Sequence, residues 1–206
     1  MIALKSLALD PNDIETILIT HFHGDHFGGL PYFMLDAQFF SKRRSPLRIL
    51  GPSGLEDWFV RVMETAFPGS SKTKPKFELT FQELTPGTTT QVGDLSITTA
   101  QVRHGPPDGP FHAYRIEVDG KTLAYTGDTV CVEELFVIGK DADLLIAEAY
   151  FFDKQVPLHL DLATLEAKLP DIAPKRLILT HMNDDMLSRG SSVPHECAHD
   201  GMTVEI

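Results

Sequence analysis

Hydrophobic and polar positions along the chain predict strands and helices in alternation. Residues 14–20 form an apolar run typical of a buried strand, whereas residues 30–40 and 55–67 carry apolar side chains at helical spacing. The segment 77–126 is strand-rich, and its Asp119-Gly120 pair between two β-like runs indicates a hairpin. Further strands are predicted at 47–50, 144–147, 176–180 and 202–206, and a further helix at 162–169.

Length and composition suit one globular domain. The 206 residues are 42% hydrophobic and 23% charged, so we expect residues 1–206 to form a single domain in which helices pack around sheets. No window approaches the apolar length of a membrane span, which argues against a membrane protein. The two Cys residues suit a reducing compartment and favour a cytoplasmic location.

The charge balance limits the partners that the protein can have. The chain holds 18 Lys and Arg residues against 29 Asp and Glu residues, which gives a formal net charge of −11. A surface of this sign repels polyanions at long range. It therefore disfavours broad binding to nucleic acid, whose affinity depends on contacts between basic side chains and phosphates.

The strongest chemical signal is the string HFHGDH at positions 21–26, directly after the first predicted strand. A strand end followed by a glycine-containing turn can direct His21 and His23 at one point. Asp25 and His26, on the next turn, then point to a second place nearby. Imidazole and carboxylate are ligands that zinc and similar divalent ions prefer, so the string predicts a metal site.

This HxHxDH string after an apolar strand resembles the signature of the metallo-β-lactamase superfamily. The resemblance implies the α+β fold of that family, an αβ/βα sandwich, and further ligands at later strand ends, which match His104, Asp128 and His181. It also implies two divalent ions joined by Asp128, with zinc as the default ion and manganese or iron as alternatives. The other implied ligands are His21, His23 and His104 for one ion, and Asp25, His26 and His181 for the second.

The string YTGDT at positions 125–129 resembles the phosphodiesterase branch of that superfamily, which includes ribonuclease Z. That branch has a Glu and a His beyond the metal ligands, and their counterparts here are Glu148 and His159. The resemblance implies that the Glu148 carboxylate orients the His159 imidazole, which then protonates the leaving group. We also predict a catalytic role for Asp25, together with Glu148 and His159. Tyr150, next to this site in sequence, is a further candidate for contact with substrate, as is Arg115.

The segment between two of the implied ligands bears on the substrate. Ribonuclease Z carries an inserted basic arm that grips transfer RNA there, whereas residues 105–127 of this chain predict only a hairpin. We therefore expect a compact phosphodiesterase for a small-molecule phosphodiester or ester, with a metal-bridging hydroxide as nucleophile and structured RNA disfavoured. The alternatives are a carboxylic-ester, lactone or thioester hydrolase, similar to a lactonase or glyoxalase II, and a metal-free binding or structural module that results from truncation.

The position of the motif predicts an N-terminally short domain. Members of the superfamily usually have several strands before HxHxDH, whereas here the motif begins at position 21. The strands that would flank the predicted strand at 14–20 are then missing. An apolar strand edge without a partner favours association, so we expect a homodimer or poor solubility.

Two further patterns predict structure rather than chemistry. The segment from His195 to His199 matches the zinc-protease string HExxH, which needs a helix with both histidines on one face. Since Pro194 places it at a helix start near the chain end, we interpret the match as accidental. A stripe on the helix predicted at 55–67 is expected to face the core, and it comprises Trp58, Phe59, Val62 and Met63.

Overall fold

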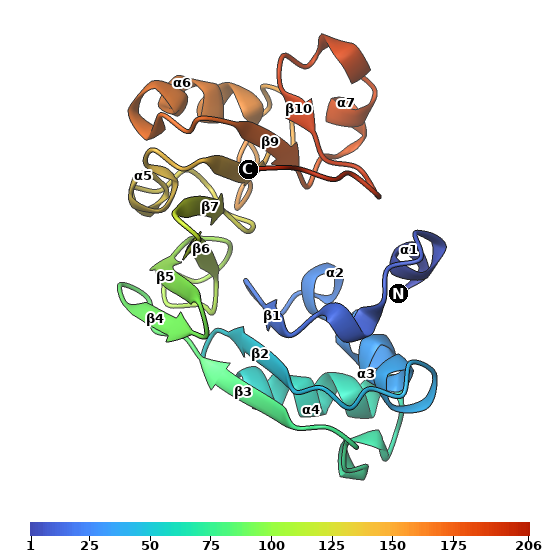
Figure 1. Ribbon diagram of the computed structural model, residues 1–206. Helices are drawn as coiled ribbons and strands as arrows, with labels where there is room; N and C mark the ends of the chain where they lie inside the picture. The colour runs from blue at the N-terminus through green and yellow to red at the C-terminus, as the bar shows by residue number, and fades with distance from the viewer. The chain divides into compact units, whose positions relative to one another are not determined.

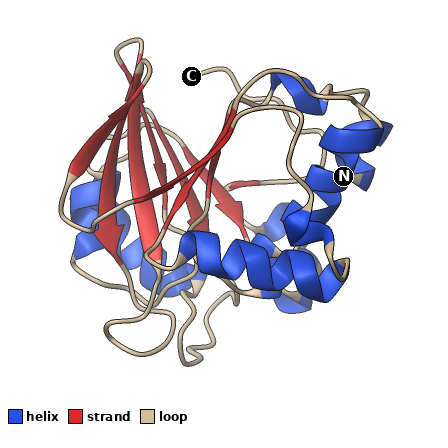
Figure 2. Ribbon diagram, turned by 90° about the horizontal axis from the view of Figure 1, so that it is seen from below, coloured by secondary structure: helices blue, strands red, loops and turns tan.

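The computed structural model describes residues 1–206. The chain divides into two compact units, Met1–Leu84 and Thr85–Ile206, and each unit contains one β-sheet (Figure 1). Helices and strands both occur throughout the chain (Figure 2), as an α+β protein requires. No helix has the length and apolar character needed to cross a membrane.

The first unit has a parallel three-stranded sheet in the order β1-β2-β3. Its central strand pairs on both sides, Ile17 with Ile49 and Ile49 with Phe81. Because that strand is covered on both faces, it is apolar almost throughout rather than alternating. The strands are β1 (Thr16–Leu18), β2 (Leu47–Gly51) and β3 (Leu79–Glu83).

Two helices complete the core of this unit. Phe33 and Met34 of one helix and Phe59 and Met63 of the other are buried in one cluster with Ile49 of the sheet. These positions follow the helical spacing that the sequence predicts. The helices and turns of the unit are α1 (Ile2–Ser6), α2 (Gly24–Phe27), α3 (Leu30–Phe39), α4 (Leu55–Ala66), η1 (Pro11–Asp13) and η2 (Ser70–Lys72).

A buried guanidinium fixes the chain segment that enters β1. Arg43 is only 1% exposed, and its Nη2 donates to the carbonyls of Ile14 and Pro46 at 2.7 Å each. Its Nη1 and Nε donate to the carbonyls of Pro11 and Ser45 at 3.1 and 2.9 Å. Each donor therefore has a partner, as a buried charge requires. These bonds tie the segments before β1 and β2 together, just ahead of the histidine motif.

The second unit has a seven-stranded sheet in the order β10-β9-β8-β7-β6-β5-β4. Pairing is antiparallel from β4 to β7 and parallel from β7 to β10. Two antiparallel steps make β5 run in the same direction as β7, so the carboxyl ends of β5, β7, β8 and β9 lie at one edge of this sheet. The strands are β4 (Thr89–Val92), β5 (Leu95–Gln101), β6 (His112–Val118), β7 (Lys121–Tyr125), β8 (Leu144–Glu148), β9 (Leu177–Thr180) and β10 (Glu196–Cys197).

Two helices of the second unit pack their apolar residues on its sheet. Leu135 and Ile138 of one and Leu165 and Ile172 of the other are buried in one core cluster with Leu145 of β8. The second helix begins at an Asp cap, where the Asp161 carboxylate accepts from the backbone N–H of Thr164 at 2.8 Å. The helices and turns are α5 (Glu134–Gly139), α6 (Leu162–Ile172), α7 (Asp184–Leu187) and η3 (Gly190–Ser192).

The hairpin predicted at Asp119-Gly120 is confirmed. β6 and β7 pair antiparallel up to Val118 and Lys121, and the two turn residues both have positive φ, 51° and 73°. This two-residue turn with positive φ at both positions matches the right-handed twist of the strands. The expectation that residues 1–206 form one domain stays a prediction.

Two predictions about the end of the chain are wrong. Residues 202–206 are irregular rather than a strand, and residues 195–199 do not begin a helix. Instead β10 pairs in parallel with β9, and Glu196 forms a bidentate ion pair with Arg176 at 2.6 and 2.7 Å. The last strand of the chain is thus β10, which lies beside β9. Its extended backbone also removes the helical face that an HExxH zinc site needs.

The core stripe predicted on α4 is correct in part. Phe59 and Met63 are buried, but Trp58 is 38% exposed. Its indole instead stacks on Phe22 with ring centroids 5.6 Å apart, and Arg61 lies over its ring at 5.4 Å. Trp58 therefore covers an aromatic side chain of the histidine motif rather than the core.

A buried histidine predicts how stability depends on pH. His112 is 3% exposed, and burial lowers its pKa from 6.5 to about 4. Between these values the unfolded chain binds more protons than the folded one, so the free energy of unfolding rises with pH. Over that range the gain is about 3 kcal/mol, which is complete above pH 6.5 and lost as the pH falls toward 4.

Urea unfolding between pH 4 and 7.5 measures this dependence. The variant His112→Phe is expected to flatten the pH profile relative to the wild type, whereas the exposed control His199→Gln is not. Parallel profiles for His112→Phe and the wild type would show that His112 does not carry the dependence. The comparison cancels the contributions of the other histidines, because both proteins contain them.

Candidate metal centre

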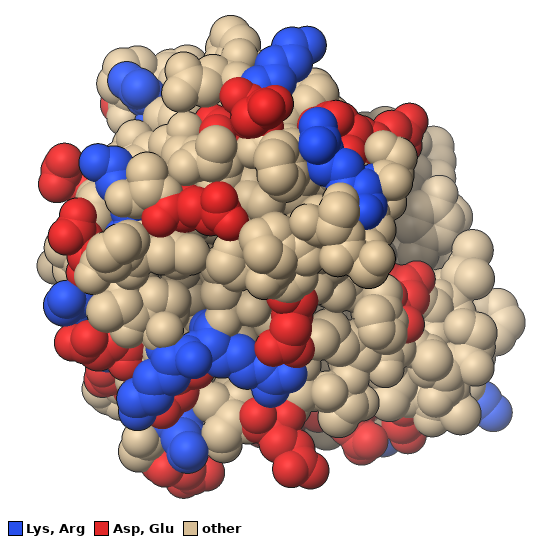
Figure 3. Space-filling view, turned by 90° about the horizontal axis from the view of Figure 1, so that it is seen from above, with Lys and Arg blue, Asp and Glu red and all other residues tan.

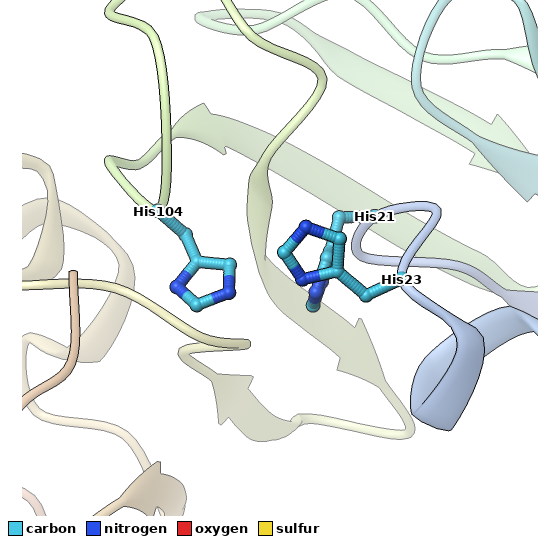
Figure 4. A group of neighbouring side chains, drawn as sticks. All are labelled: His21, His23 and His104. Carbon is cyan, nitrogen blue, oxygen red and sulfur yellow. The ribbon is translucent and has the colours of Figure 1, made fainter.

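Three imidazoles of the first unit gather directly after β1. The His21 side chain is buried, and its Nδ1 lies 3.1 Å from Oγ1 of Thr20. Its ring centroid lies 4.5 Å from that of His23 and 4.2 Å from that of His26. Figure 4 shows His21 and His23 extending from the same short turn. The strand end and turn thus bring together the ligands that the spacing predicts.

The one-turn helix α2 places the other ligands of the motif. Oδ2 of Asp25 lies 3.3 Å from Nε2 of His26. The turn closes tightly at Gly28, where an added Cβ would lie 2.4 Å from the carbonyl oxygen of Gly24. Any side chain at that position would force the turn open. The aromatic residues between the ligands, Phe22 and Phe27, contact each other at 5.4 Å.

The second unit contributes its groups from one sheet edge. His104 follows β5, Asp128 follows β7, Glu148 ends β8 and His181 follows β9. These four strands point the same way, so their carboxyl ends bring together side chains from distant parts of the chain. His104, labelled in Figure 4, lies on the loop after β5. His181 has a positive φ of 52°, an uncommon conformation for histidine that marks a constrained position.

Asp128 lies at the centre of this group. Its carboxylate is 3% exposed, and its Oδ2 lies 3.2 Å from Nε2 of His181 and 3.7 Å from Nε2 of His104. The ligand-type atoms of His104, Asp128 and His159 all lie within 4.8 Å of one another. A buried carboxylate among imidazole nitrogens is suited to a cation.

The tautomer of His104 supports this assignment. Its Nδ1 lies 2.7 Å from the carbonyl oxygen of Leu158, and because a carbonyl only accepts, Nδ1 must carry the proton. Burial lowers the pKa of His104, which favours the neutral ring, in which Nε2 carries a lone pair. That lone pair faces a carboxylate oxygen of Asp128 at 3.7 Å. Two acceptors that face each other fit a divalent cation between them.

Backbone strain accompanies the bond to His104. Leu158 has a φ of 71°, which is costly for a residue with a branched side chain. This conformation turns its carbonyl toward Nδ1 of His104. No pattern in the sequence indicates the contact, because it joins residues 54 positions apart. A metal-binding histidine commonly donates its second nitrogen to such a partner.

A carboxylate–imidazole pair lies beside these groups. Glu148 is 0% exposed, and its Oε2 lies 2.9 Å from Nδ1 of His159. Its Oε1 accepts from the backbone N–H of Thr129. Burial raises the pKa of Glu148, and these two hydrogen bonds oppose that effect. The contact expected from the family pattern is therefore present, and it fixes the ring of His159 through Nδ1.

Arg115 takes a structural role. Its guanidinium donates to the carbonyls of Ile138 and Lys140 at 3.1 and 2.8 Å and pairs with Glu117 at 3.0 Å. These bonds tie β6 to the end of α5, so the expected contact with substrate is not supported. Each unit brings its own predicted site residues together; that both sets hold two ions jointly stays a prediction.

Comparison with known proteins identifies the family. Residues 3–182 match the family model described as "Beta-lactamase superfamily domain". Ribonuclease Z of Shouchella clausii is 28% identical over 222 residues, which cover 82% of this chain and 69% of that protein. The crystal structure of the short form of human tRNase Z aligns with a TM-score of 0.77 at 23% identity, over 98% of this chain and 83% of that one.

A third relative is a diphosphatase of the PhnP family, whose crystal structure aligns with a TM-score of 0.69 at 20% identity, over 94% of this chain and 72% of that one. The two structural likenesses confirm the predicted α+β fold, and the match over residues 3–182 shows the family. The chain therefore belongs to the β-lactamase superfamily, in the ribonuclease Z-like branch of its metal-dependent hydrolases.

Proposed function

We propose that the protein is a dinuclear hydrolase that cleaves small phosphodiesters. The observation that carries the proposal is the contact of 2.9 Å between Glu148 and His159 beside the buried Asp128. A proton donor next to a cation site suits a reaction in which an alkoxide leaves. The ligands proposed for the ions are His21, His23 and His104 for one, Asp25, His26 and His181 for the other, and Asp128 for both.

The donor atoms support zinc as the ion, since most of them are imidazole nitrogens. When bound, two divalent ions supply Lewis-acid activation of the nucleophile and neutralise charge on the substrate. The chain orients these ligands itself. Leu158 holds His104 through Nδ1, so that Nε2 is available for an ion.

The protein's own acid is His159. The buried Glu148 carboxylate accepts a hydrogen bond from the Nδ1–H of His159, which fixes the tautomer and supports the charged form of the ring. Nε2 of the imidazolium can then give its proton to the leaving oxygen. Glu148 is a positioning residue in this scheme, since it acts through the imidazole.

The connection between two proposed ligands supports a small substrate. Between His104 and Asp128 the chain contains a loop and the β6–β7 hairpin, with no inserted arm. Acidic and basic side chains are interspersed on the face shown in Figure 3, and the net charge is −11. Both features disfavour the many phosphate contacts that folded RNA needs. The relative described as a diphosphatase is consistent with a small phosphate ester.

Elemental analysis together with a substrate screen tests the proposal. We expect about two equivalents of metal per chain, and metal-dependent hydrolysis of a bis-aryl phosphodiester in preference to a lactone or a glutathione thioester. Preference for the lactone or thioester would favour the acyl hydrolase. Folded protein that takes up no metal would favour the binding module. A homodimer and a cytoplasmic location stay predictions.

A further inference from the structure

Tyr150 connects the two loops that carry His159 and His181. Its backbone N–H donates to the carbonyl of Leu160 at 2.8 Å, and its own carbonyl accepts from the N–H of Asn183 at 3.1 Å. Leu160 is next to His159, and Asn183 lies two positions after His181. The main chain at Tyr150 thus sets the spacing between the proposed acid and a proposed ligand.

The ring of Tyr150 lies flat against the proposed acid. Its centroid is 4.3 Å from that of His159, with an angle of 18° between the planes. His181 lies 5.6 Å from Tyr150 at 31°, and 5.3 Å from His159 at 14°. The three rings are therefore close to parallel. Phe151 contacts the Tyr150 ring edge-on at 5.1 Å and 87°, and no stacking of Phe151 on His159 is seen.

We propose that Tyr150 is a positioning residue that holds the His159 imidazole in the orientation needed for proton donation. The inference rests on the proposed function. The hydrogen bond from Nδ1 to Glu148 fixes one point of the ring at 2.9 Å, and a hydrogen bond of this kind does not by itself prevent rotation of the ring about that point. An aromatic ring stacked at 4.3 Å removes this rotation, because tilting the imidazole would separate the stacked faces.

The proposal assigns the effect to the ring and not to the phenol hydroxyl. Tyr150→Phe keeps the stacked face, whereas Tyr150→Leu and Tyr150→Met remove it. The control Phe151→Leu changes a neighbouring aromatic side chain that does not stack on His159. All four variants leave every proposed ligand in place, so we expect unchanged metal content.

Kinetics with two leaving groups separates positioning from general structural damage. With an alkyl leaving group, which needs protonation, Tyr150→Leu is expected to lower kcat about tenfold while KM stays unchanged. With a 4-nitrophenyl leaving group, which needs little protonation, kcat should change less than twofold. Tyr150→Phe and Phe151→Leu should behave as the wild type with both. Equal losses on both substrates, or a similar loss in Tyr150→Phe, would overturn the proposal.

NMR spectra of the His159 ring give a readout that needs no activity. In the wild type we expect the ring protons of His159 to be shifted upfield by the stacked Tyr150 and its Nδ1 proton to exchange slowly. Tyr150→Leu should remove the upfield shift and speed up the exchange of the Nδ1 proton. If Tyr150→Leu folds poorly, Tyr150→Met is used in its place. Unchanged His159 signals would contradict the proposal. If the wild type hydrolyses no substrate but Tyr150→Leu still changes the His159 signals as expected, only the proposed function is refuted.

Discussion

Replacing Asp128 by Asn is expected to abolish metal binding and to lower kcat/KM by about 1000-fold or more. The Asp128 carboxylate is buried, and its Oδ2 lies 3.2 and 3.7 Å from the Nε2 atoms of His181 and His104. An amide of the same size cannot supply the negative charge that two cations share. Elemental analysis and initial-rate kinetics on the purified variant measure both effects.

The matched control is Asp143→Asn. Asp143 precedes β8 and binds Lys175 at 2.8 Å and the N–H of Thr122 at 2.8 Å, which places it at the amino end of the strand and away from the ligands. Its variant should keep metal and activity. If Asp128→Asn retained two equivalents of metal, the assignment of Asp128 as the shared ligand would be wrong.

Replacing His159 by Ala is expected to lower kcat by about 10²–10⁴-fold, the usual value of a general acid, with the metal content unchanged. The expected loss is largest for substrates with poor leaving groups, because these depend most on protonation. The proposed ligands stay in place in His159→Ala. Elemental analysis should therefore find metal in His159→Ala but not in Asp128→Asn, while kinetics should show lower activity in both. The exposed His199→Ala serves as control, and full activity of His159→Ala on an alkyl ester would exclude His159 as the acid.

The local part of the site could be predicted from the sequence. The four proposed ligands at positions 21–26 follow β1 in one short string, and their cluster needs only a strand end and one turn. His104, Asp128 and His181 could be assigned because each follows a strand and matches a family position. These three residues come close together because their strands run in the same direction, an arrangement that the alternation of strands and helices already favoured.

Contacts that depend on tertiary packing could not be predicted. The hydrogen bond from His104 to the Leu158 carbonyl needs a positive φ at Leu158, which a leucine in the sequence does not indicate. The pairing of β10 with β9 was not predicted. The residue pattern favoured a strand at 202–206, and periodicity does not say which segment pairs with a sheet. Trp58 was misplaced for a similar reason, since its spacing suits the core but Phe22 supplies a nearer aromatic partner.

The neighbouring residues Leu158 and His159 have a joint consequence for control of the enzyme. One holds His104 through its carbonyl, and the other binds Glu148 through its ring. A displacement of this loop would therefore move the proposed metal ligand His104 and the proposed acid His159 together. A change that shifts residues 158 and 159 is therefore expected to weaken metal binding and proton donation together.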